Sequence, residues 1–468
     1  MTAAGSTAAG PPAGSLRQML VPLALAQFIC SFAGSNMNVM INDISTDLNT
    51  TVQGVQIAIT IFLLVMAALM IPGGKLTDRY GRKRCFLAGL TLYGIGALLS
   101  AVSPGLGVLI LGNSILEGVG TALLIPPVYI LTTLLFTGVA ARAKAFGLIS
   151  AMGGVGAAAG PLIGGLITSA LSWRWAFVFQ AIVVGVIVVL GRKVLDPLPP
   201  DPTRPFDTRG AVLSAVGLIL VVAGILAADD NVWLMLGLIA AGVLLLFLFF
   251  RWVRAQERAG REPLLSTSLF HNRTSNFGLV TQNAQWLILM GTSFTVAAYL
   301  QVVRGYDAIQ TGLIFTAATV GLLISSLAAE RLAKRRPQRT LIQAGFVLTA
   351  LGVIVLLALV TGTPGVWAFA PGLLLIGLGL GLMLTPSVNI VQSSFSDDQQ
   401  GEISGLSRSV SNLGSSLGTA VAGTILVAGI TATPERAYGL AMSVLAVVAI
   451  AGLWAAAKLP KTAANRAG

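Results

Sequence analysis

The segment Gly73–Arg84, GGKLTDRYGRKR, carries five of the chain's 29 Lys and Arg residues within twelve positions. Two apolar runs, residues 55–72 and 85–102, enclose it, and each is long enough to cross a bilayer. Lys and Arg close to the ends of spanning helices are retained on the cytoplasmic side. We therefore interpret this segment as a short cytoplasmic loop, which fixes the direction of every other span.

The composition is that of a multi-pass membrane protein. Charged residues make up 10% of the chain, against about 25% in a typical soluble domain, and the mean hydropathy is +0.86. Apolar spans of about twenty residues follow one another along the whole chain. They cover residues 19–42, 55–73, 85–102, 105–131, 145–171, 174–194, 209–228, 232–252, 275–301, 309–329, 340–361, 366–392, 404–430 and 436–457. The predicted fold class is all-α, with fourteen transmembrane helices.

An even number of spans places both termini on the cytoplasmic side of the cell membrane. Strict alternation also leaves all but three of the 29 basic residues on that side, the exceptions being Arg174, Arg304 and Arg436. The net charge of +12 is therefore explained by membrane orientation and by contact with anionic lipid. It gives no reason to expect nucleic acid as a partner.

The order of the spans predicts two bundles of six helices with two further helices inserted between them. The predicted parts are an N-terminal tail at 1–18, a bundle at 19–195, a linker at 196–208, the inserted pair at 209–253, a second linker at 254–274, the second bundle at 275–458 and a C-terminal tail at 459–468. Residues 254–273 fit either a surface-lying amphipathic stretch or a solvated linker. Residues 328–339, AAERLAKRRPQR, repeat the basic character of the 73–84 loop, so the bundles are expected to be parallel repeats.

Cysteine and histidine usage gives no indication of a metal, a cofactor or an enzyme. Cys30 and Cys85 fall at opposite membrane depths, which favours neither a disulfide nor a metal site. His271, the only histidine, falls in a linker, and the membrane core lacks a nucleophile motif or a carboxylate pair. The sequence also lacks a phosphate-binding loop, so gradients remain as the energy source.

Glu117 is the one acidic residue that falls near the middle of a span. An unpaired carboxylate at the bilayer centre costs about 2.5–3.5 kcal/mol on insertion scales and marks an ion or substrate path. Burial favours the neutral carboxylic acid, which can then bind and release a proton. The alternative is a permanently protonated side chain that hydrogen-bonds a neighbouring helix.

Polar side chains at helical spacing mark a candidate cavity. In the first span they follow one another at steps of three or four and so share one face. The candidate cavity residues are Gln27, Ser31, Ser35, Asn38 and Asn42 in the first span, Asn113 in the fourth, Gln282, Gln285 and Trp286 in the ninth, and Asn389 and Gln392 in the twelfth. This stripe must face protein or water, so it either lines a path or holds the bundle together by interhelical hydrogen bonds.

Two glycine-containing motifs stand apart from these polar positions. The fifth span holds Gly156, Gly160, Pro161, Gly164 and Gly165, whose small side chains allow another helix to approach closely. In the basic loop the glycines are Gly74 and Gly81, with Asp78 as the lone acid beside Arg79 and Arg82. The loop is either a topogenic charge cluster or a latch, in which Asp78 and Arg79 pair with helix ends and favour an outward-open state.

The loop spacing Gly74-x-Leu76-x-Asp78-Arg79-x-Gly81-Arg82-Lys83 resembles the signature loop of the major facilitator superfamily. The span-five motif is similar to the antiporter motif of its drug-exporting branch. With the fourteen spans and the segment PLLSTSLFHN at 263–272, these features resemble the fourteen-helix drug:H⁺ antiporter family. The resemblance implies two six-helix bundles that rock around a central cavity, lined chiefly by spans 1, 4, 9 and 12.

Two positions depart from that family's pattern. Ala33 stands where the first helix usually carries an acid, and Ser114 stands where the fourth usually carries an arginine, with Glu117 in place of a glutamine. We therefore hypothesise that Glu117 takes over as the proton-accepting group.

The resemblance implies multidrug efflux and antibiotic resistance. We expect a monomeric antiporter that exports hydrophobic, neutral or cationic molecules in exchange for protons, with membrane lipids as further partners. One alternative is an uncoupled facilitator or an exporter of a lipid-like metabolite. Another is a non-transporting membrane receptor or scaffold.

Overall fold

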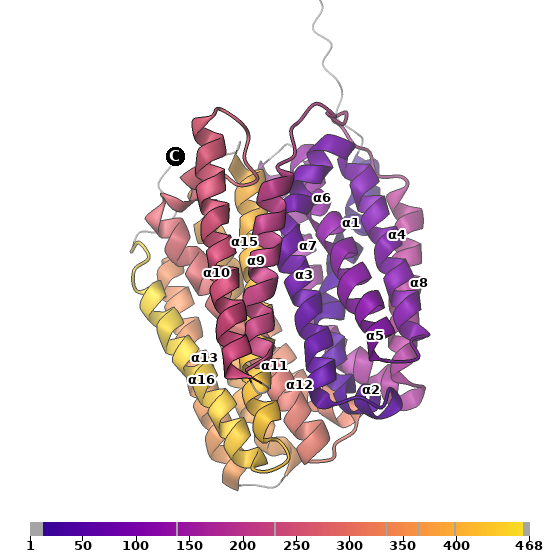
Figure 1. The fold of residues 1–468 in the computed structure, drawn as a ribbon, viewed down its shortest axis with the longest axis vertical. Coiled ribbons are helices and arrows are strands. Elements are labelled where there is room, and N and C mark those ends of the chain that lie inside the picture. Colours follow the sequence, from indigo (N-terminus) through magenta and orange to yellow (C-terminus); the bar gives the residue numbers. More distant parts are fainter. Residues whose placement is uncertain are drawn as a thin grey trace, which may run out of the picture.

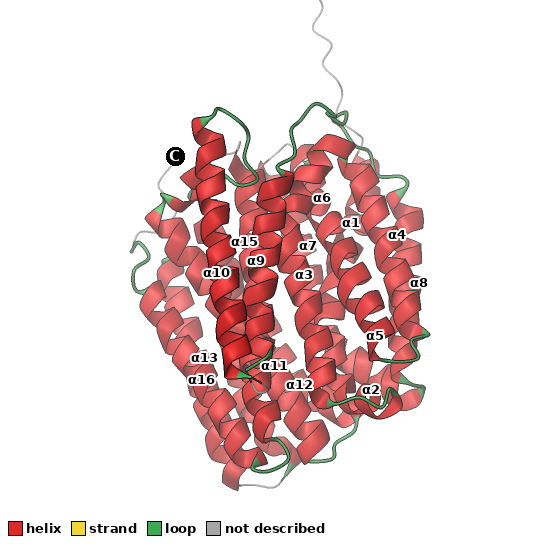
Figure 2. Cartoon of the chain, in the orientation of Figure 1, coloured by secondary structure: helices red, strands yellow, loops and turns green. Residues whose placement is uncertain are grey.

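The structure is a computed structural model that describes residues 13–136, 139–228, 231–333, 335–362, 365–396 and 399–461. Within these ranges every regular element is a helix (Figure 2). Fourteen helices are long and apolar enough to cross a membrane, which confirms the fourteen predicted spans. Most of the two predicted tails lies outside the described residues, and α1 already begins at Ala13.

Residues of the predicted first bundle form ten elements. They are α1 (Ala13–Asn36), η1 (Met37–Met40), α2 (Ile41–Asp47), α3 (Val52–Tyr80), α4 (Arg82–Ala101), α5 (Leu106–Leu109), η2 (Ile110–Glu117), α6 (Gly118–Leu135), α7 (Val139–Ala170) and α8 (Trp173–Gly191). The two central spans are α9 (Thr208–Leu226) and α10 (Val232–Arg258). We call α1 to α8 the first half of the molecule.

The remaining elements make up the second half, preceded by a short helix in the linker. They are η3 (Thr267–Phe270), α11 (Arg273–Ala298), η4 (Tyr299–Val303), α12 (Ala308–Ala333), α13 (Gln338–Gly362), η5 (Val366–Phe369), α14 (Ala370–Gln392), α15 (Gln400–Gly429) and α16 (Pro434–Ala456). The two halves lie side by side, with α9 and α10 against their junction (Figure 1). Leu64 of α3, Val222 of α9 and Ala420 of α15 pack together there.

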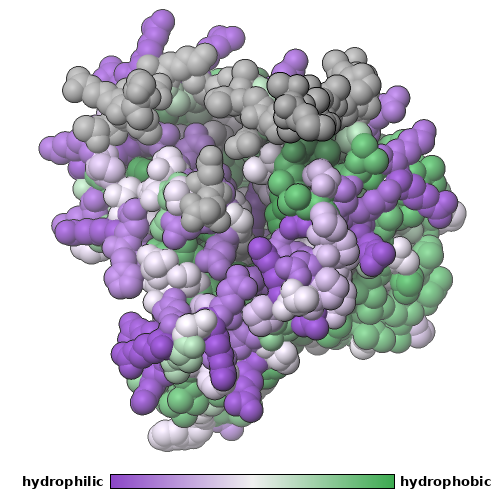
Figure 3. All heavy atoms as spheres, turned by 90° about the horizontal axis from the view of Figure 1, so that it is seen from above, coloured by the Kyte–Doolittle hydropathy of each residue, from purple (hydrophilic) through white to green (hydrophobic). Residues whose placement is uncertain are grey.

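The predicted loop at residues 73–84 is helical except at Gly81, since α3 runs to Tyr80 and α4 begins at Arg82. This basic segment lies at the end of the bundle where α1 begins, the upper end in Figure 1. We call this the basic end and the other the opposite end. Seen from above, hydrophilic side chains gather over much of the basic end (Figure 3). Gly81 makes the turn between α3 and α4 with a φ of +94°, a conformation that glycine adopts without strain.

Three short elements interrupt the long spanning helices. The 3₁₀ turn η1 carries Asn38, the π-helical η2 carries Asn113 and Glu117, and the π-helical η4 carries Gln301. The sequence pattern predicts uninterrupted helices here, because a change of winding leaves the apolar composition unaltered. Such π turns recur at functional sites.

Glycine packing repeats in the two halves. A methyl group added at Gly156 of α7 would collide with the backbone carbonyl of Phe28 on α1. A methyl group at Gly414 of α15 would collide in the same way with the carbonyl of Asn283 on α11. The fifth helix of each half thus packs closely against the first helix of its own half, as small residues allow.

Gly156→Ala is expected to lower the thermal stability of the protein, because the new Cβ meets a backbone oxygen that cannot move aside. Overpacking of this kind costs about 1–3 kcal/mol in the free energy of unfolding. Gly154→Ala is the control on the same helix, since the space around Gly154 is open to 4 Å. A melting curve of the purified protein checks both variants, and equal melting temperatures would contradict the packing argument.

Candidate functional site

The two halves touch at the opposite end through η1, α2, η4 and α11. The Asn38 Nδ2 atom donates to the Ser293 Oγ atom over 3.1 Å. Gln301 donates to the carbonyl of Asn38 at 2.7 Å and accepts from the backbone N–H of Asn42 at 3.1 Å. Nearby, Ser169 of α7 accepts from the backbone N–H of Ile309 on α12 at 3.1 Å. Polar contacts therefore hold the halves together at this end.

Helices α3 and α15 connect the halves along a second line. Gln56 donates to the carbonyl oxygens of Thr419 and Ala420 at 3.1 and 3.2 Å. Closer to the basic end, Lys75 of α3 pairs with Glu402 of α15 at 2.8 Å. This ion pair joins the halves within the described chain, and Lys75 belongs to the segment at residues 73–84 that the sequence singled out.

Helices α6 and α14 lie in different halves and are not among the helix pairs that pack closely in the described chain. Thr385 and Asn389 on α14 are nevertheless polar and exposed. Polar side chains on a spanning helix face protein or water, since lipid offers them no hydrogen bonds. These two side chains therefore face protein or water near the basic end of α14, which ends at Gln392.

The polar stripe on the first span divides into parts with different surroundings. Gln27 donates to Ser31 at 3.1 Å and accepts from the Tyr129 hydroxyl of α6 at 3.1 Å. Ser35 donates to the carbonyl of Ala157 at 3.0 Å and so binds α1 to α7. Asn42 is exposed at the opposite end. The structure thus places Ser35 in an interhelical contact, and Gln27 and Ser31 beside α6.

The polar candidates of the second half also differ in exposure. Gln282 accepts from Ser407 at 2.8 Å, and Gln285 accepts from Ser387 at 2.9 Å. Both amides are buried, and their Nε2 atoms have no hydrogen-bond partner among the described residues. Trp286 is partly buried against the core, and Gln392 donates to Ser404 at 3.4 Å.

Glu117 lies inside the first half, at the end of η2. Its Cγ atom and backbone face Gly96 of α4, where a Cβ would come within 2.9 Å. Tyr93 is the neighbouring polar side chain, and its hydroxyl donates to Gln180 of α8 at 2.5 Å. Glu117 is fully buried, and both carboxyl oxygens lack a partner among the described groups, as does the Asn113 Nδ2 atom. Such surroundings favour the neutral acid over the carboxylate.

Arg408 of α15 is a residue that the sequence analysis did not single out. Its guanidinium carbon lies 4.7 Å from the centre of the Tyr129 ring, which belongs to the other half. It takes no part in the ion pairs found among the described residues. Arg408 is the ninth of the 30 residues of α15, so burying its charge costs less than the value of about 2.5–3.5 kcal/mol for a helix centre. A cation–π contact returns about 0.5–2 kcal/mol.

The acid of the basic loop pairs within its own half and its adjoining linker. Asp78 accepts from Arg82 at 2.7 Å and from Arg204 at 3.0 Å. Arg79 lies over the ring of Tyr80, with 5.7 Å between its guanidinium carbon and the ring centre. A methyl group added at Gly74 would lie at van der Waals distance from Pro126, and one added at Gly81 would lie so from Asp196 and Pro200. The latch residues therefore cluster at the basic end, and Lys75 makes the contact with the second half.

Reversing the charge of Lys75 is expected to disturb the junction between α3 and α15. Lys75→Glu would face Glu402 at the position of the present 2.8 Å pair, and Glu262 lies 4.0 Å away. We expect a loss of about 1 kcal/mol, since the pair is only partly buried. The double variant Lys75→Glu/Glu402→Lys should recover the melting temperature, and failure to recover would show that the pair does not bridge the halves.

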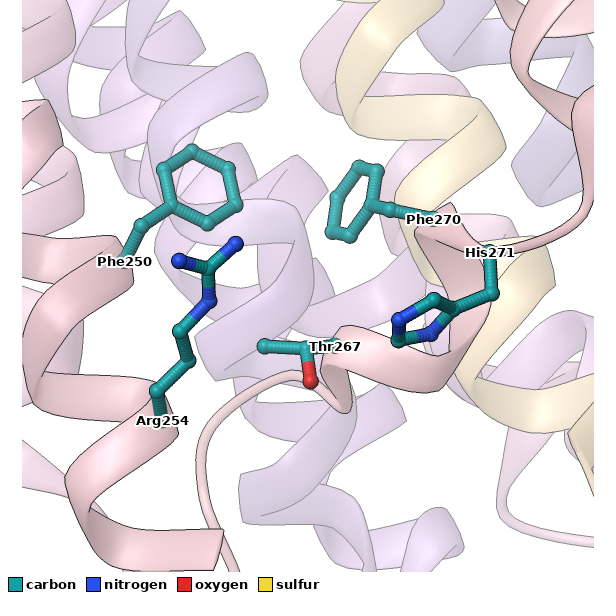
Figure 4. Close-up of a pocket in the computed structure, with 5 residues that line it drawn as sticks. All are labelled: Phe250, Arg254, Thr267, Phe270 and His271. Carbon is teal, nitrogen blue, oxygen red and sulfur yellow. The ribbon is translucent and has the colours of Figure 1, made fainter.

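A cavity of about 240 Å³ lies at the basic end between α10 and η3. Phe250 and Arg254 line one side, and Thr267, Phe270 and His271 line the other (Figure 4). Phe250 and Phe270 meet edge to face, with 5.5 Å between their ring centres. Residues 254–273 thus continue α10 and then fold back as η3.

The described residues offer no cluster that could hold a metal ion. Groups of three or more His, Cys, Asp and Glu side chains are absent from the searched part of the chain. Cys30 and Cys85 are both buried and free, and Cys30 donates to the Thr121 hydroxyl.

Comparisons with known proteins agree with this architecture. The sequence profile of the Major Facilitator Superfamily matches residues 23–419 and 280–467. A puromycin resistance protein of Streptomyces alboniger is 31% identical over 414 residues, which cover 87% of this chain and 81% of the relative. A probable actinorhodin transporter of Streptomyces coelicolor is 29% identical over 430 residues, which cover 90% of this chain and 74% of the relative.

The fold is shared with solved transporters. The crystal structure of a peptide transporter in complex with alafosfalin superposes with a TM-score of 0.68 at 19% identity, and the match covers 93% of each chain. That likeness concerns the fold alone, since the identity is low. The profile match covers most of the sequence, and the relatives match over most of their length. The chain therefore belongs to the major facilitator superfamily of membrane transporters, and is not an enzyme.

Proposed function

We propose that this protein exports hydrophobic small molecules across the cell membrane by alternating access, in exchange for protons. The arrangement of the two halves is the observation that carries this proposal. They are joined by polar contacts at the opposite end, whereas toward the basic end they meet through Lys75 and Glu402, and α6 and α14 are not among the closely packed helix pairs. A rigid-body rocking of the halves would open the contact at the opposite end and bring α6 and α14 together at the basic end. A central site would then be exposed to each side of the membrane in turn.

The basic end faces the cytoplasm in this proposal, because Lys and Arg near helix ends are retained inside. The described conformation is then inward-facing. Asp78 pairs with Arg82 and Arg204 of its own side of the molecule, as expected for a latch that has not engaged the second half. Outward opening would require the cytoplasmic ends of α6 and α14 to approach each other, in addition to the existing contact between Lys75 and Glu402.

Export of drug-like molecules is supported by the roles that the names of two relatives state. One is a puromycin resistance protein and another a probable actinorhodin transporter. The buried amides of Gln282 and Gln285 retain unpartnered Nε2 donors, which suit recognition by shape and a few hydrogen bonds. We propose that the candidate cavity residues on α1, α11 and α14 contribute to this site.

Proton exchange would use Glu117, which is fully buried and has no charged partner. The neighbouring Tyr93 hydroxyl donates to Gln180. These two groups form a short hydrogen-bonded chain that begins beside the carboxyl group. Protonation would occur in one orientation of the halves and release in the other, provided that water reaches the carboxyl in the second orientation.

The second candidate is uncoupled facilitated export. The position of Glu117 favours it, because the described groups around the carboxyl, Gly96, Tyr93 and Cys30, all belong to the first half. A proton site enclosed in one half can change its hydration without responding to substrate. Accumulation against a gradient separates the two candidates.

The experiment uses the full chain in vesicles of one orientation, with puromycin and rhodamine 6G as probes. A difference of one pH unit supports about tenfold accumulation per exchanged proton. We expect accumulation of at least one probe with the gradient, and its loss when a protonophore is added. If the probe only reaches equal concentrations inside and outside, with or without the protonophore, the uncoupled facilitator is favoured. Exclusion of both probes from the vesicles would count against drug export.

A further inference from the structure

Arg408 and Tyr129 meet across the interface between the halves. The guanidinium lies over the ring of Tyr129, with 4.7 Å between its carbon and the ring centre. A guanidinium carries five N–H donors, so contact with one ring leaves donors for other partners. Arg408 makes neither an ion pair nor a side-chain hydrogen bond among the described residues.

The two residues lie inside the bundle and not at its rim. Arg408 follows the start of α15 by eight residues, or roughly 12 Å of helix, and Tyr129 precedes the end of α6 by six, or roughly 9 Å. Both distances are measured from the basic ends of the two helices. A molecule that entered from this end would meet the cation roughly 9–12 Å beyond those ends.

The surroundings combine hydrogen-bonding groups with an apolar surface. The Tyr129 hydroxyl donates to Gln27, and Gln27 donates to Ser31. On α7 the ring of Phe146 stacks on that of Tyr129 with 5.9 Å between the centres. A cation without an acid, next to two stacked rings and an amide, is suited to a molecule with an apolar body and one acidic group.

We propose that Arg408 binds the carboxylate of an apolar organic acid, whose body packs against Tyr129 and Phe146. This proposal deepens the proposed export function, on which it rests. It replaces the neutral or cationic cargo expected from the sequence with an anionic one. Such a ligand would touch Arg408 in the second half and Tyr129 in the first. Its binding would therefore shift the equilibrium between the orientations of the two halves.

The test measures binding by the purified full chain, with dansyl-phenylalanine and its methyl ester as matched probes that differ in one negative charge. The ligand concentration for a half-maximal shift of the melting temperature is recorded for each. A charge-assisted contact should make the acid about tenfold tighter than the ester. Arg408→Ala should remove that preference while the affinity for the ester stays the same.

Arg408→Lys keeps the charge and should retain part of the preference, which covers the case in which the alanine variant does not fold. Arg258→Ala changes an exposed arginine at the end of α10 and should behave like the unmodified protein. A preference for the acid that survives in Arg408→Ala would overturn the proposal, as would equal affinities in the unmodified protein.

Uptake of the ester by vesicles separates this proposal from the export function. Loss of pH-driven uptake of every probe would refute proton-driven export and leave the binding result standing. Uptake of the ester without any preference for the acid would refute the role of Arg408 alone.

Discussion

Cross-linking Asn38→Cys to Ser293→Cys with a short bifunctional thiol reagent is expected to reduce transport to the level of empty vesicles. The two side chains meet at 3.1 Å across the halves at the opposite end. A short tether there would prevent outward opening, whichever molecule is exported. The chain used for the test carries Cys30→Ala and Cys85→Ala, because both native thiols are free.

The controls make the result specific to separation of the halves. Each single cysteine variant treated with the reagent should keep its transport rate, and a reductant that cleaves the tether should restore the double variant. A long, flexible tether should permit transport. Full activity of a chain shown by mass to be cross-linked with the short reagent would contradict outward opening at this contact.

Glu117→Gln is expected to abolish accumulation against a gradient while leaving downhill movement of the same probe intact. Glutamine keeps the size of the side chain and cannot exchange a proton. Accumulation should fall from about tenfold per pH unit to simple equilibration. Parallel time courses with and without an imposed pH gradient measure both quantities.

Glu435→Gln is the matched control, because it makes the same change at an exposed acid in the first turn of α16. It should accumulate the probe like the unmodified protein. Unchanged accumulation by Glu117→Gln would remove that residue from the proton mechanism. The melting temperatures of both variants establish whether any loss comes from misfolding.

The spanning helices could be predicted from the sequence because bilayer thickness imposes their length and apolar composition. The basic end could be predicted in the same way, since its Lys and Arg cluster next to the spans. Side-chain direction was harder to predict. Ser35 belongs to the same stripe as Gln27, yet it packs against α7, because the facing Gly156 and Gly160 bring that helix close.

Arg408 was missed because it lies near the start of a span and was counted with the cytoplasmic charges. Helix α15 begins at Gln400, four residues before the predicted span, which places Arg408 deeper than the apolar pattern indicates. Its neighbour Tyr129 is 279 residues away in the sequence, so only the fold brings the two together. The lone Arg beside a run of serines at 407–416 was the available signal.

The roles of Glu117 in proton exchange and of Asp78 as a latch stay predictions. The surroundings of each residue set a condition that its role must meet. Glu117 is enclosed by groups of one half, so its hydration must change during transport if it carries protons. Asp78 is paired within its own side, so its role as a latch requires a second conformation.

The most direct measurement of proton-coupled export records the pH inside vesicles when a transported probe is added with no imposed gradient. A pH dye sealed inside the vesicles reports the change. We predict that movement of substrate in one direction drives protons in the other, and that the signal is lost in Glu117→Gln. Movement of the probe without any change in internal pH would contradict exchange and leave facilitated export as the function.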